Sequence, residues 1–512
     1  MTSTNPAYIR DSRPLAVLLT ASTGCAMTVL DTNIVAVVLP TIARDLGASF
    51  AQVEWVISTY VLCFAALLLP AGAIADRYGR RKVFLGGILL FALASLLCGA
   101  APTAPALYLA RAAQGVGAAF LLAPALAVIG HAFHDEAERA KAWAVWGGMM
   151  GLTMVLAPIL GGVIAYTLGW RWAFFVNLPI CAALAAAVVW LIPESRDMDA
   201  RRLDPLGIVF FAGAMFGLTW GLIQGQAHGW ASQASLAGFA AGLISLALFL
   251  IAERRQARPM LDLSLFKIPR FVGAVLAMFA YAASAQVMAS LLPLYLQNGL
   301  GRPALAAGFA MLPFALAMLI LPQVGRRVGR RLAGYQILAL GLAVVCLGNL
   351  VTGWAAGAAN WPGVILGMAV LGSGGGLLNG ETQKAIMGTV PRHRAGMASG
   401  ISTTARFTGI LLGFAALSAV LATQARDRLI ADLCRAFADR CAHASLFAGQ
   451  TIAGNVAGAM AALAPGRQAA ALDLARHGYA TGFSAALYVA AGFAALASLL
   501  VMALMRPRPS AE

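Results

Sequence analysis

Charged side chains are rare inside the long apolar runs of this sequence, and the few that occur there are the first candidates for chemistry. Two acids, Asp31 and Glu381, and two bases, Arg111 and Arg406, lie within such runs. A third acid, Glu54, stands at the very start of a run, where we expect water to reach it. A charge at the centre of a membrane helix costs about 2.5–3.5 kcal/mol, so each of the four deep charges needs a partner or a function.

Asp31 and Arg111 have the residue types and the depth for proton transfer. Asp31 lies about 24 Å along a helix from Leu15, and Arg111 lies roughly 8 Å from the start of its own run. If successive runs cross a membrane in opposite directions, the two side chains reach a similar depth. Burial favours a neutral carboxyl and a nearby guanidinium favours a charged one, so a carboxyl balanced between them exchanges protons near neutral pH. The alternative is a static ion pair that only fixes two helices.

Glu381 and Arg406 leave more alternatives open. Glu381 lies about 30 Å along a helix from Trp361, near the cytoplasmic end of its run. There it is either an entry site for cations or an interfacial acid beside Lys384. Arg406 either faces a cavity or binds a backbone carbonyl, and the sequence does not separate these two roles.

The composition around these residues is that of a polytopic membrane protein. The 512 residues are 61% hydrophobic and 11% charged, too few charges to cover a soluble protein. The first run is too long for a cleavable signal peptide and has no cleavage site. Runs of roughly twenty apolar residues predict fourteen membrane helices, near 15–42, 53–74, 83–101, 106–130, 142–166, 171–192, 205–224, 235–252, 271–296, 304–324, 333–354, 362–383, 398–422 and 482–505.

Basic residues mark alternate connections between these runs. Most of the 36 Lys and Arg lie in the loops 76–82, 131–141, 193–204, 253–270, 325–332 and 384–396. Because short loops rich in Lys and Arg stay in the cytoplasm, they predict a multi-pass protein of the plasma (inner) membrane with both termini cytoplasmic. The net charge of +16 then reports topology and contact with anionic membrane lipid, and we expect no nucleic-acid binding.

One basic loop has a distinctive pattern, GAIADRYGRRK at 72–82. Gly72 and Gly79 predict close packing of two helices around a tight turn. Asp76 is placed to accept hydrogen bonds from helix ends or from arginines such as Arg77 and Arg80. We therefore predict that this loop is a conformational gate that holds one closed state at the cytoplasmic side.

Further motifs accompany this loop. The chain carries LDTNIVAVVLP at 30–40, RAAQGVG at 111–117, APILGG at 157–162, WRWAFFVNLP at 170–179 and a second basic turn, RRVGRR, at 326–331. Together they resemble the fourteen-helix drug:proton antiporters of the major facilitator superfamily over nearly the whole chain. One departure is Ala157, where that family usually has glycine.

The resemblance implies an all-α integral membrane protein with the major facilitator fold, two six-helix bundles plus two inserted helices. We expect residues 1–192 to form the first bundle, 193–256 the inserted helices, and 257–512 the second bundle with an outer loop at 423–481. Such transporters bind substrate between the bundles near the midplane. We expect Tyr60 to line that cavity, together with Arg406 and Glu381.

The fifth run contains Pro158, Gly161 and Gly162. These residues predict a kinked helix face with few side chains, which would let the two bundles close tightly on the outer side and resist proton leak. Ordinary close packing requires the same residues, and the sequence cannot separate the two explanations.

Residues 423–481 break the pattern of short outer connections. Helical spacing of apolar residues predicts two or three amphipathic helices over the outer opening, and Pro465-Gly466 would end the last of them. Cys434 and Cys441 lie in this segment and a disulfide between them is left open. The other five cysteines lie in apolar runs and are expected to be packing residues.

The leading hypothesis is a proton-coupled antiporter that exports hydrophobic, preferably cationic, drugs or biocides from the cytoplasm. Asp31 and Arg111 would couple protons, and the proton gradient would replace any cofactor. No metal or phosphate-binding motif is present, and we expect no enzyme activity. The alternative is a dedicated exporter of an endogenous metabolite such as an antibiotic, a lipid or a siderophore. A receptor or scaffold that transports nothing is the third class. We expect a monomer.

Overall fold

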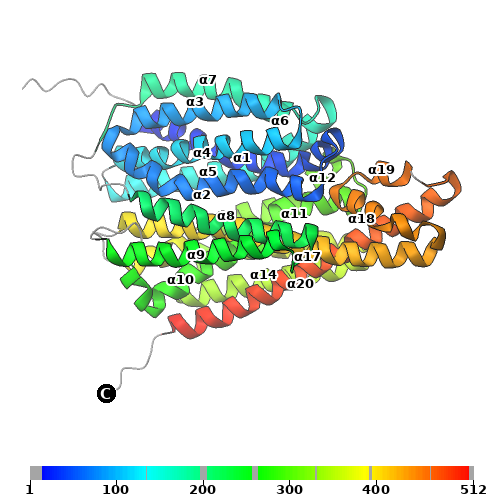
Figure 1. Cartoon of the computed structure of the whole chain (residues 1–512). Helices are drawn as coiled ribbons and strands as arrows, with labels where there is room; N and C mark the ends of the chain where they lie inside the picture. Colours follow the sequence, from blue (N-terminus) through cyan, green and yellow to red (C-terminus); the bar gives the residue numbers. More distant parts are fainter. Residues whose placement is uncertain are drawn as a thin grey trace, which may run out of the picture.

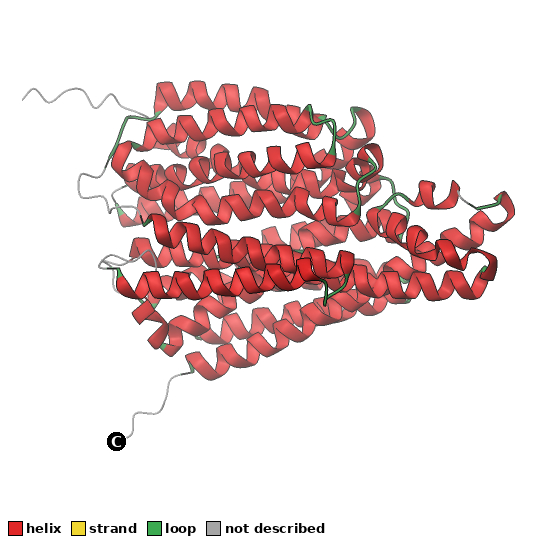
Figure 2. Cartoon of the chain, viewed as in Figure 1, coloured by secondary structure: helices red, strands yellow, loops and turns green. Residues whose placement is uncertain are grey.

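The computed structural model describes residues 14–133, 135–196, 204–256, 263–328, 331–390, 395–461 and 463–506. Over these residues the chain is helical, and no β-strand occurs among them (Figure 2). Fourteen helical segments of the described chain are long and apolar enough to cross a membrane. The predicted number of membrane helices is therefore confirmed. Part of the second basic turn, Gly329 and Arg330, lies outside the described residues.

The first half of the chain contributes six spans. They are α1 (Pro14–Leu46), α2 (Phe50–Tyr78), α3 (Arg80–Gly99), α4 (Ala104–Ala132), α5 (Glu136–Thr167), and a last span made of the short α6 (Trp172–Phe175) and α7 (Asn177–Leu191). Side-chain oxygens start several of them: Ser49 caps α2, Thr103 caps α4 and Asp135 caps α5. The two inserted spans, α8 (Pro205–His228) and α9 (Gln233–Arg255), pack on each other.

The second half contains more interrupted helices. The span Pro269–Gly299 combines α10 (Pro269–Tyr281), the π-helical η2 (Ala282–Gln286), α11 (Met288–Leu294) and the π-helical η3 (Tyr295–Gly299), after a 3₁₀ turn η1 (Leu263–Lys267). π-Helical turns often mark functional positions. The remaining helices of the spans are α12 (Ala304–Ala310), α13 (Leu312–Val328), α14 (Gly334–Gly357), α15 (Trp361–Leu378), α16 (Glu381–Gly388), α17 (Ala395–Ala436) and α20 (Pro465–Met505).

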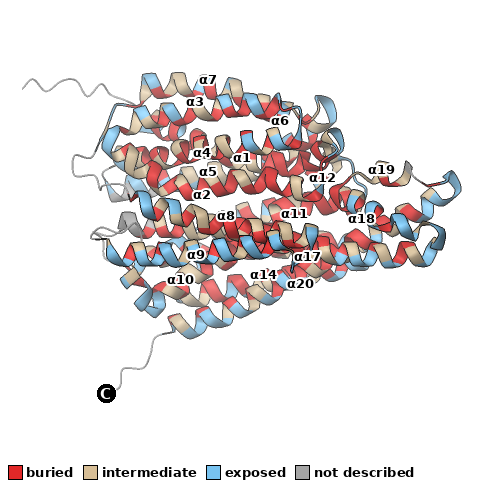
Figure 3. Ribbon diagram, viewed as in Figure 1, coloured by how far each residue is buried: buried red, intermediate tan, exposed pale blue. Residues whose placement is uncertain are grey.

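The helices of both halves lie side by side and run along the long direction of the molecule (Figure 1). Buried residues gather where helices face one another, and the outward faces of α7, α9 and α20 are largely exposed (Figure 3). Those exposed faces carry large apolar side chains, among them Leu243 and Leu499. Water is a poor solvent for such a surface, so these faces are suited to contact lipid.

The predicted bounds of the outer loop are wrong, although the segment is helical as expected. The thirteenth span does not stop near residue 422, because α17 continues to Ala436, and the last span starts at Pro465. Leu429 of the α17 extension packs against Gly478 of α20, so the apolar spacing that we assigned to a separate helix is the seam between two long ones. The short helix over Val456–Ala461 does end before Pro465-Gly466, as predicted. Pro465 also starts the next helix, which suits its fixed φ at a first helical position.

The extensions of α17 and α20 project beyond the other helices (Figure 1). Between them lie a 3₁₀ turn η5 (Ala438–His443) and two short helices, α18 (Ala444–Ala453) and α19 (Val456–Ala461). We call this end of the molecule the outer end, following the predicted orientation. α18 packs on α1 and α2 and so covers part of the outer end of the first bundle.

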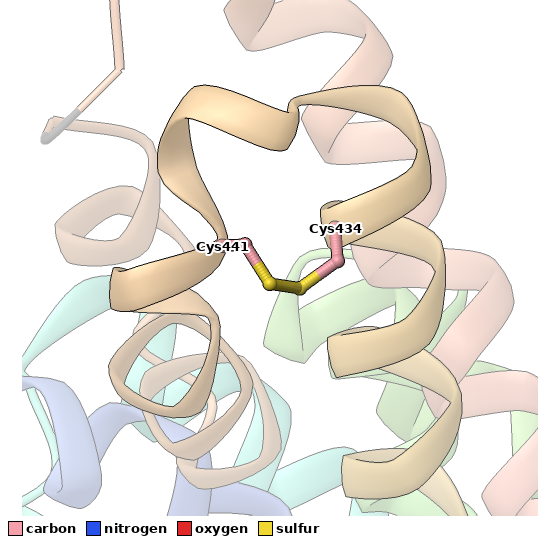
Figure 4. The surroundings of a disulfide bond; sticks show 2 residues. All are labelled: Cys434 and Cys441. Carbon is pink, nitrogen blue, oxygen red and sulfur yellow. A yellow bond between two sulfur atoms is a disulfide. The ribbon is translucent and has the colours of Figure 1, made fainter.

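The disulfide that the sequence left open is formed. Cys434 near the end of α17 is bonded to Cys441 in η5, with 4.5 Å between their Cα atoms (Figure 4). The chain leaves α17 at Ala436 and bends back through η5, which brings the two residues together. Disulfides persist in oxidising compartments, in agreement with an outer position for this projection.

The predicted orientation can be tested with single cysteines in a variant whose five free cysteines are replaced by alanine. Cysteine at Ala231, in the connection between α8 and α9, should react with an impermeant thiol reagent in intact cells. Cysteine at Arg196, in the connection between α7 and α8, should react only after the cells are opened. Labelling with the reverse pattern would invert the topology.

Candidate functional site

Asp31 of α1 and Arg111 of α4 form a fully buried ion pair. The guanidinium Nη1 of Arg111 donates to Oδ2 of Asp31, and the two side chains are 1% and 0% exposed. The predicted similarity in depth is therefore confirmed. Removing one partner of such a pair leaves a buried charge without compensation, which typically costs about 3–5 kcal/mol.

Two amides complete the coordination of the Asp31 carboxylate, and one hydroxyl holds both amides. The Gln114 amide donates to Oδ1 of Asp31 over 2.8 Å, and the Asn177 amide donates to the same oxygen over 3.2 Å. Both amides also donate to the Ser95 hydroxyl, over 2.8 and 3.3 Å. The Gln114 carbonyl in turn accepts from Arg111 over 2.7 Å. The site is thus a closed network from α1, α3, α4 and α7 that stabilises a charged Asp31.

Sequence reasoning missed Gln114, Ser95 and Asn177 as members of this site. All three are fully buried. Gln114 lies three residues after Arg111, on the same face of α4, and this spacing is the signal that would have found it. Ser95 and Asn177 carry only a weaker signal, a polar residue within an apolar run.

Tyr60 connects this network to the second half of the chain. Its buried ring lies under the guanidinium of Arg111, 4.1 Å from Cζ to the ring centre. It also stacks on Phe64 at 6.0 Å, and Phe64 meets the edge of Phe407 of α17 at 4.3 Å. A continuous line of rings therefore runs from the ion pair in the first bundle to a helix of the second.

Arg406 and Glu381 lie away from the ion pair. Nε of Arg406 donates to Oε1 of Gln286 in the π-helical η2 over 2.9 Å, so its partner is a side-chain amide and not the backbone carbonyl that we considered. The predicted helix containing Glu381 is broken at Gly380, whose φ is +90°. Glu381 begins α16, is 14% exposed and pairs with Lys384 at 3.4 Å, as the interfacial alternative predicted.

The basic turn at 72–82 is held in part by contacts among its own residues. Asp76 accepts from Nη2 of Arg80 at 2.8 Å, within the predicted set of arginines. The turn between α2 and α3 is made by Gly79, whose φ of +114° excludes most side chains. Arg77 lies over the neighbouring Tyr78 ring, 5.6 Å from its centre. The structure differs at Gly72, where the nearest contact to an added Cβ would be Ala123 at an ordinary 3.9 Å.

Glu194, which sequence reasoning also missed, closes the turn from the α7 side. Its carboxylate accepts from the backbone N–H of Arg81 over 3.1 Å and of Lys82 over 3.2 Å, the first free donors of α3. The N–H of Arg80 donates to the carbonyl of Ser195 over 2.9 Å. A carboxylate at a helix N-terminus is stabilising, so Glu194 ties the segment after α7 to the turn.

The residues Pro158, Gly161 and Gly162 lie where α5 meets α1 and α12. A Cβ at Gly161 would come within 3.2 Å of the Ile34 Cα of α1, and one at Gly162 within 2.9 Å of the Leu305 Cα of α12. The carbonyl of Pro158 faces Gly308 of α12 so closely that a side chain there would clash. This face therefore brings helices of the two halves into backbone contact, as predicted.

A hydrogen bond adds to the closure at the outer end. The Gln297 amide in η3 donates to the Val37 carbonyl of α1 over 2.7 Å. Together with the contact between α5 and α12, it shows that the outer ends of the two halves are joined in this conformation. The same contact fits either explanation of the glycines, tight closure or ordinary packing.

Comparison with known proteins agrees with this architecture. The family profile described as Major Facilitator Superfamily matches residues 21–414. The chain belongs to the major facilitator superfamily. Among solved structures, a bacterial homolog to the human lysosomal transporter Spinster, in an inward-facing and occupied conformation, covers 96% of both chains with a TM-score of 0.64. At 17% sequence identity this neighbour shows the superfamily fold alone.

Relatives in the superfamily are more similar in sequence. Multidrug resistance protein Stp of Mycobacterium tuberculosis (strain CDC 1551 / Oshkosh) is 35% identical over 83% of this chain and 79% of its own length. Cephamycin export protein CmcT of Amycolatopsis lactamdurans is 36% identical over 80% of this chain and 86% of its own. The superfamily consists of membrane transporters, and the all-α fold with fourteen spans is confirmed.

One acid of this superfamily member is not where we predicted. Glu54 was expected at the water-accessible start of a run, and this prediction is wrong because its side chain is fully buried. The run begins earlier, at Phe50, and α8 covers this part of α2. The Glu54 carboxylate accepts a hydrogen bond from the Gln226 amide of α8.

The role of Glu194 can be tested by Glu194→Ala. Loss of the carboxylate cap should destabilise the protein by about 1 kcal/mol and lower the maximal transport rate more than the apparent substrate affinity, since Glu194 holds a gate and not a ligand. Thermal unfolding and transport kinetics in liposomes measure both. Glu138→Ala, which removes an exposed acid near the start of α5, is the matched control. A change in affinity alone would contradict a gating role.

Proposed function

We propose that this chain is a proton-coupled antiporter of the plasma (inner) membrane that exports hydrophobic drugs from the cytoplasm, with both termini cytoplasmic. The observation that carries the proposal is the buried Asp31–Arg111 pair with its amide donors. The names of two relatives, a multidrug resistance protein and a cephamycin export protein, support small-molecule efflux. In this proposal the proton gradient supplies the energy for export.

Proton binding at Asp31 would change the network in a defined way. The charged carboxylate accepts from Arg111, Gln114 and Asn177. A proton cancels the charge of Asp31 and removes most of its attraction on Arg111. Arg111 is then a buried cation whose remaining contacts are the Val56 and Gln114 carbonyls and the Tyr60 ring. Arg111 lies against Tyr60, so its movement is passed to Phe64 and to Phe407 on α17. This is our route from protonation to the contact between the two halves.

The cycle follows from this route. Asp31 takes a proton from the outside when the outer end is open and releases it to the cytoplasm in the outer-closed state described above. A charged Asp31 with saturated donors fits the state after release. Drug moves in the opposite direction through the space between the halves, with Tyr60 and Arg406 as predicted lining residues. A single chain contains every part of this cycle, and we propose that it acts as a monomer.

A dedicated exporter of an endogenous metabolite is the second candidate. Cephamycin export protein CmcT, at 36% identity, and a tetracenomycin C resistance and export protein of Streptomyces glaucescens, at 31% identity over 98% of this chain, favour it. A resistance profile of an efflux-deficient host expressing this chain separates the candidates. Resistance to many unrelated compounds supports drug export, and resistance to one chemical class supports a dedicated exporter.

The coupling role is tested by Asp31→Asn in proteoliposomes. The variant should lose efflux driven by an imposed pH gradient, because an amide cannot exchange the proton. The rate should fall to that of the wild type with a collapsed gradient. The double variant Asp31→Asn/Arg111→Gln leaves no unpaired buried charge and controls for misfolding. Gradient-driven transport that persists in a well-folded variant would leave the ion pair with a purely structural role.

Glu381 tests the preference for cations. If this acid attracts cations at the cytoplasmic mouth, Glu381→Gln should reduce efflux of monovalent cations by up to about fivefold, as for an interaction of about 1 kcal/mol at a surface. Divalent cations should lose at least as much, and neutral compounds should lose nothing. Efflux of one compound of each charge in the same strain measures this order. Equal losses would show that Glu381 and Lys384 only anchor the end of a helix.

A further inference from the structure

Glu54 is a buried acid that the coupling network does not use. It lies near the start of α2, at the outer end, and its side chain is fully buried. One carboxylate oxygen accepts from the Gln226 amide of the inserted helix α8, and the fully buried Ser418 of α17 lies beside the same carboxyl. Three elements meet at this group: α2 of the first half, α17 of the second half and α8 of the inserted pair.

The hydrogen bonding of Glu54 is incomplete. Within the part of the chain that the structure describes, neither Oε1 of Glu54 nor Oγ of Ser418 has a hydrogen-bond partner of normal geometry. A protonated carboxyl supplies one more donor to this pair of neighbouring oxygens, and it avoids burying a charge that no cation balances. The geometry of the site therefore suits the neutral acid.

Aromatic packing fixes α8 in this position. The Trp55 ring, next to Glu54, lies 5.8 Å from Phe216 and 5.7 Å from Trp220, both on α8. α8 packs against both α2 and α17, and Figure 1 shows it beside α2. The Trp55 ring is itself buried under the inserted helix.

The charged groups on the elements around Glu54 are engaged or distant. Arg111 of α4 and Asp31 of α1 bind each other, and Asp45 of α1 binds Arg171. On α17, Arg426 lies about 12 Å beyond Ser418, and the next arginine, Arg428, pairs with Asp432. His228 is exposed at the outer end of α8, and Arg44 at the outer end of α1 binds Thr41. Arg406 of α17 binds Gln286. The cations of α3 lie in the basic turn, at the opposite end of that helix, and α18 has no titratable side chain.

We propose that Glu54 is a second proton-binding site, separate from Asp31, and that its protonated form latches the outer end closed through α8 and α17. The proposal rests on the proposed function, because it assumes that the outer end opens during transport. Opening separates α2 from α17, which belong to different halves, and admits outer water to the start of α2. The proton then leaves Glu54 for that water, and the resulting carboxylate is solvated and does not return to the buried site until it binds a proton again.

The Glu54 proton therefore leaves to the outside and returns from the outside, and it adds nothing to the number of protons transported. Its effect is on the conformational equilibrium: an acidic outer medium favours the closed outer end. The inserted helices acquire a function in this account. α8 supplies the Gln226 amide that binds the neutral acid and the aromatic rings that pack on the neighbouring Trp55. Because α8 contacts both halves, the protonation state of Glu54 affects the packing of each.

The latch is tested by distances between spin labels, which need neither substrate nor gradient and so do not depend on the transport assays above. Cysteines at Pro102, before α4, and at Ala358, after α14, are exposed in outer connections of the two halves. They are labelled at one pH in the variant without free cysteines, and pulsed electron resonance is then recorded in nanodiscs at about pH 5.5 and about pH 8.5. The wild type should show a longer distance whose population rises with pH, by up to about tenfold per pH unit for one linked proton.

Two variants decide the outcome. Glu54→Gln mimics the neutral acid and should keep the short distance at both pH values. Gln226→Ala loosens the latch and should show the long distance already at about pH 5.5, although Glu54 is intact. Glu138→Gln, an exposed acid at the other end of the molecule, should behave as the wild type. A wild type without pH response, or a Glu54→Gln variant that keeps the response, would overturn the proposal.

Discussion

The burial of the Asp31 carboxylate away from water is the constraint on which the rest of the first half depends. A charge in that position is tolerable only with a cation and several donors around it. Two spans supply them: Arg111 and Gln114 on α4 and Asn177 on α7 donate to the two oxygens of Asp31. Ser95 on α3 accepts from both amides and so helps to hold them beside the carboxylate. A single protonation event therefore acts on the packing of a whole bundle.

Contact between the halves depends on the opposite device, the absence of side chains. Gly161, Gly162 and Gly308 let α5 approach α1 and α12 at backbone distance. Surfaces without side chains have few hydrogen bonds or interlocked rotamers to break, so they can separate and rejoin repeatedly at low cost. The polar networks at Asp31 and Glu54 are far more directional. The molecule thus combines glycine-lined helix contacts that can open and close with polar sites whose protonation sets which state is favoured.

The sequence predicted these parts unequally. The number of spans and the pairing of Asp31 with Arg111 follow from length, depth and charge, which are local properties. Glu194 was missed, and the burial of Glu54 was not predicted, because their partners lie more than a hundred residues away in the chain. These partners are the first turn of α3 and the inserted helix α8. The outer loop was misread for a related reason: apolar spacing in 429–437 shows that a helix is covered, but not that α20 covers it.

The projection of α17 and α20 has a practical consequence. Most of a transporter of this size is hidden in detergent or lipid, which leaves image alignment in electron cryomicroscopy with little to work on. Here two continuous helices carry the orientation of the second half beyond the membrane, and the Cys434–Cys441 bond closes the bend that follows α17. An antibody fragment raised against this projection would act as a fiducial marker. Its orientation in each image would report the orientation of the second half in that state.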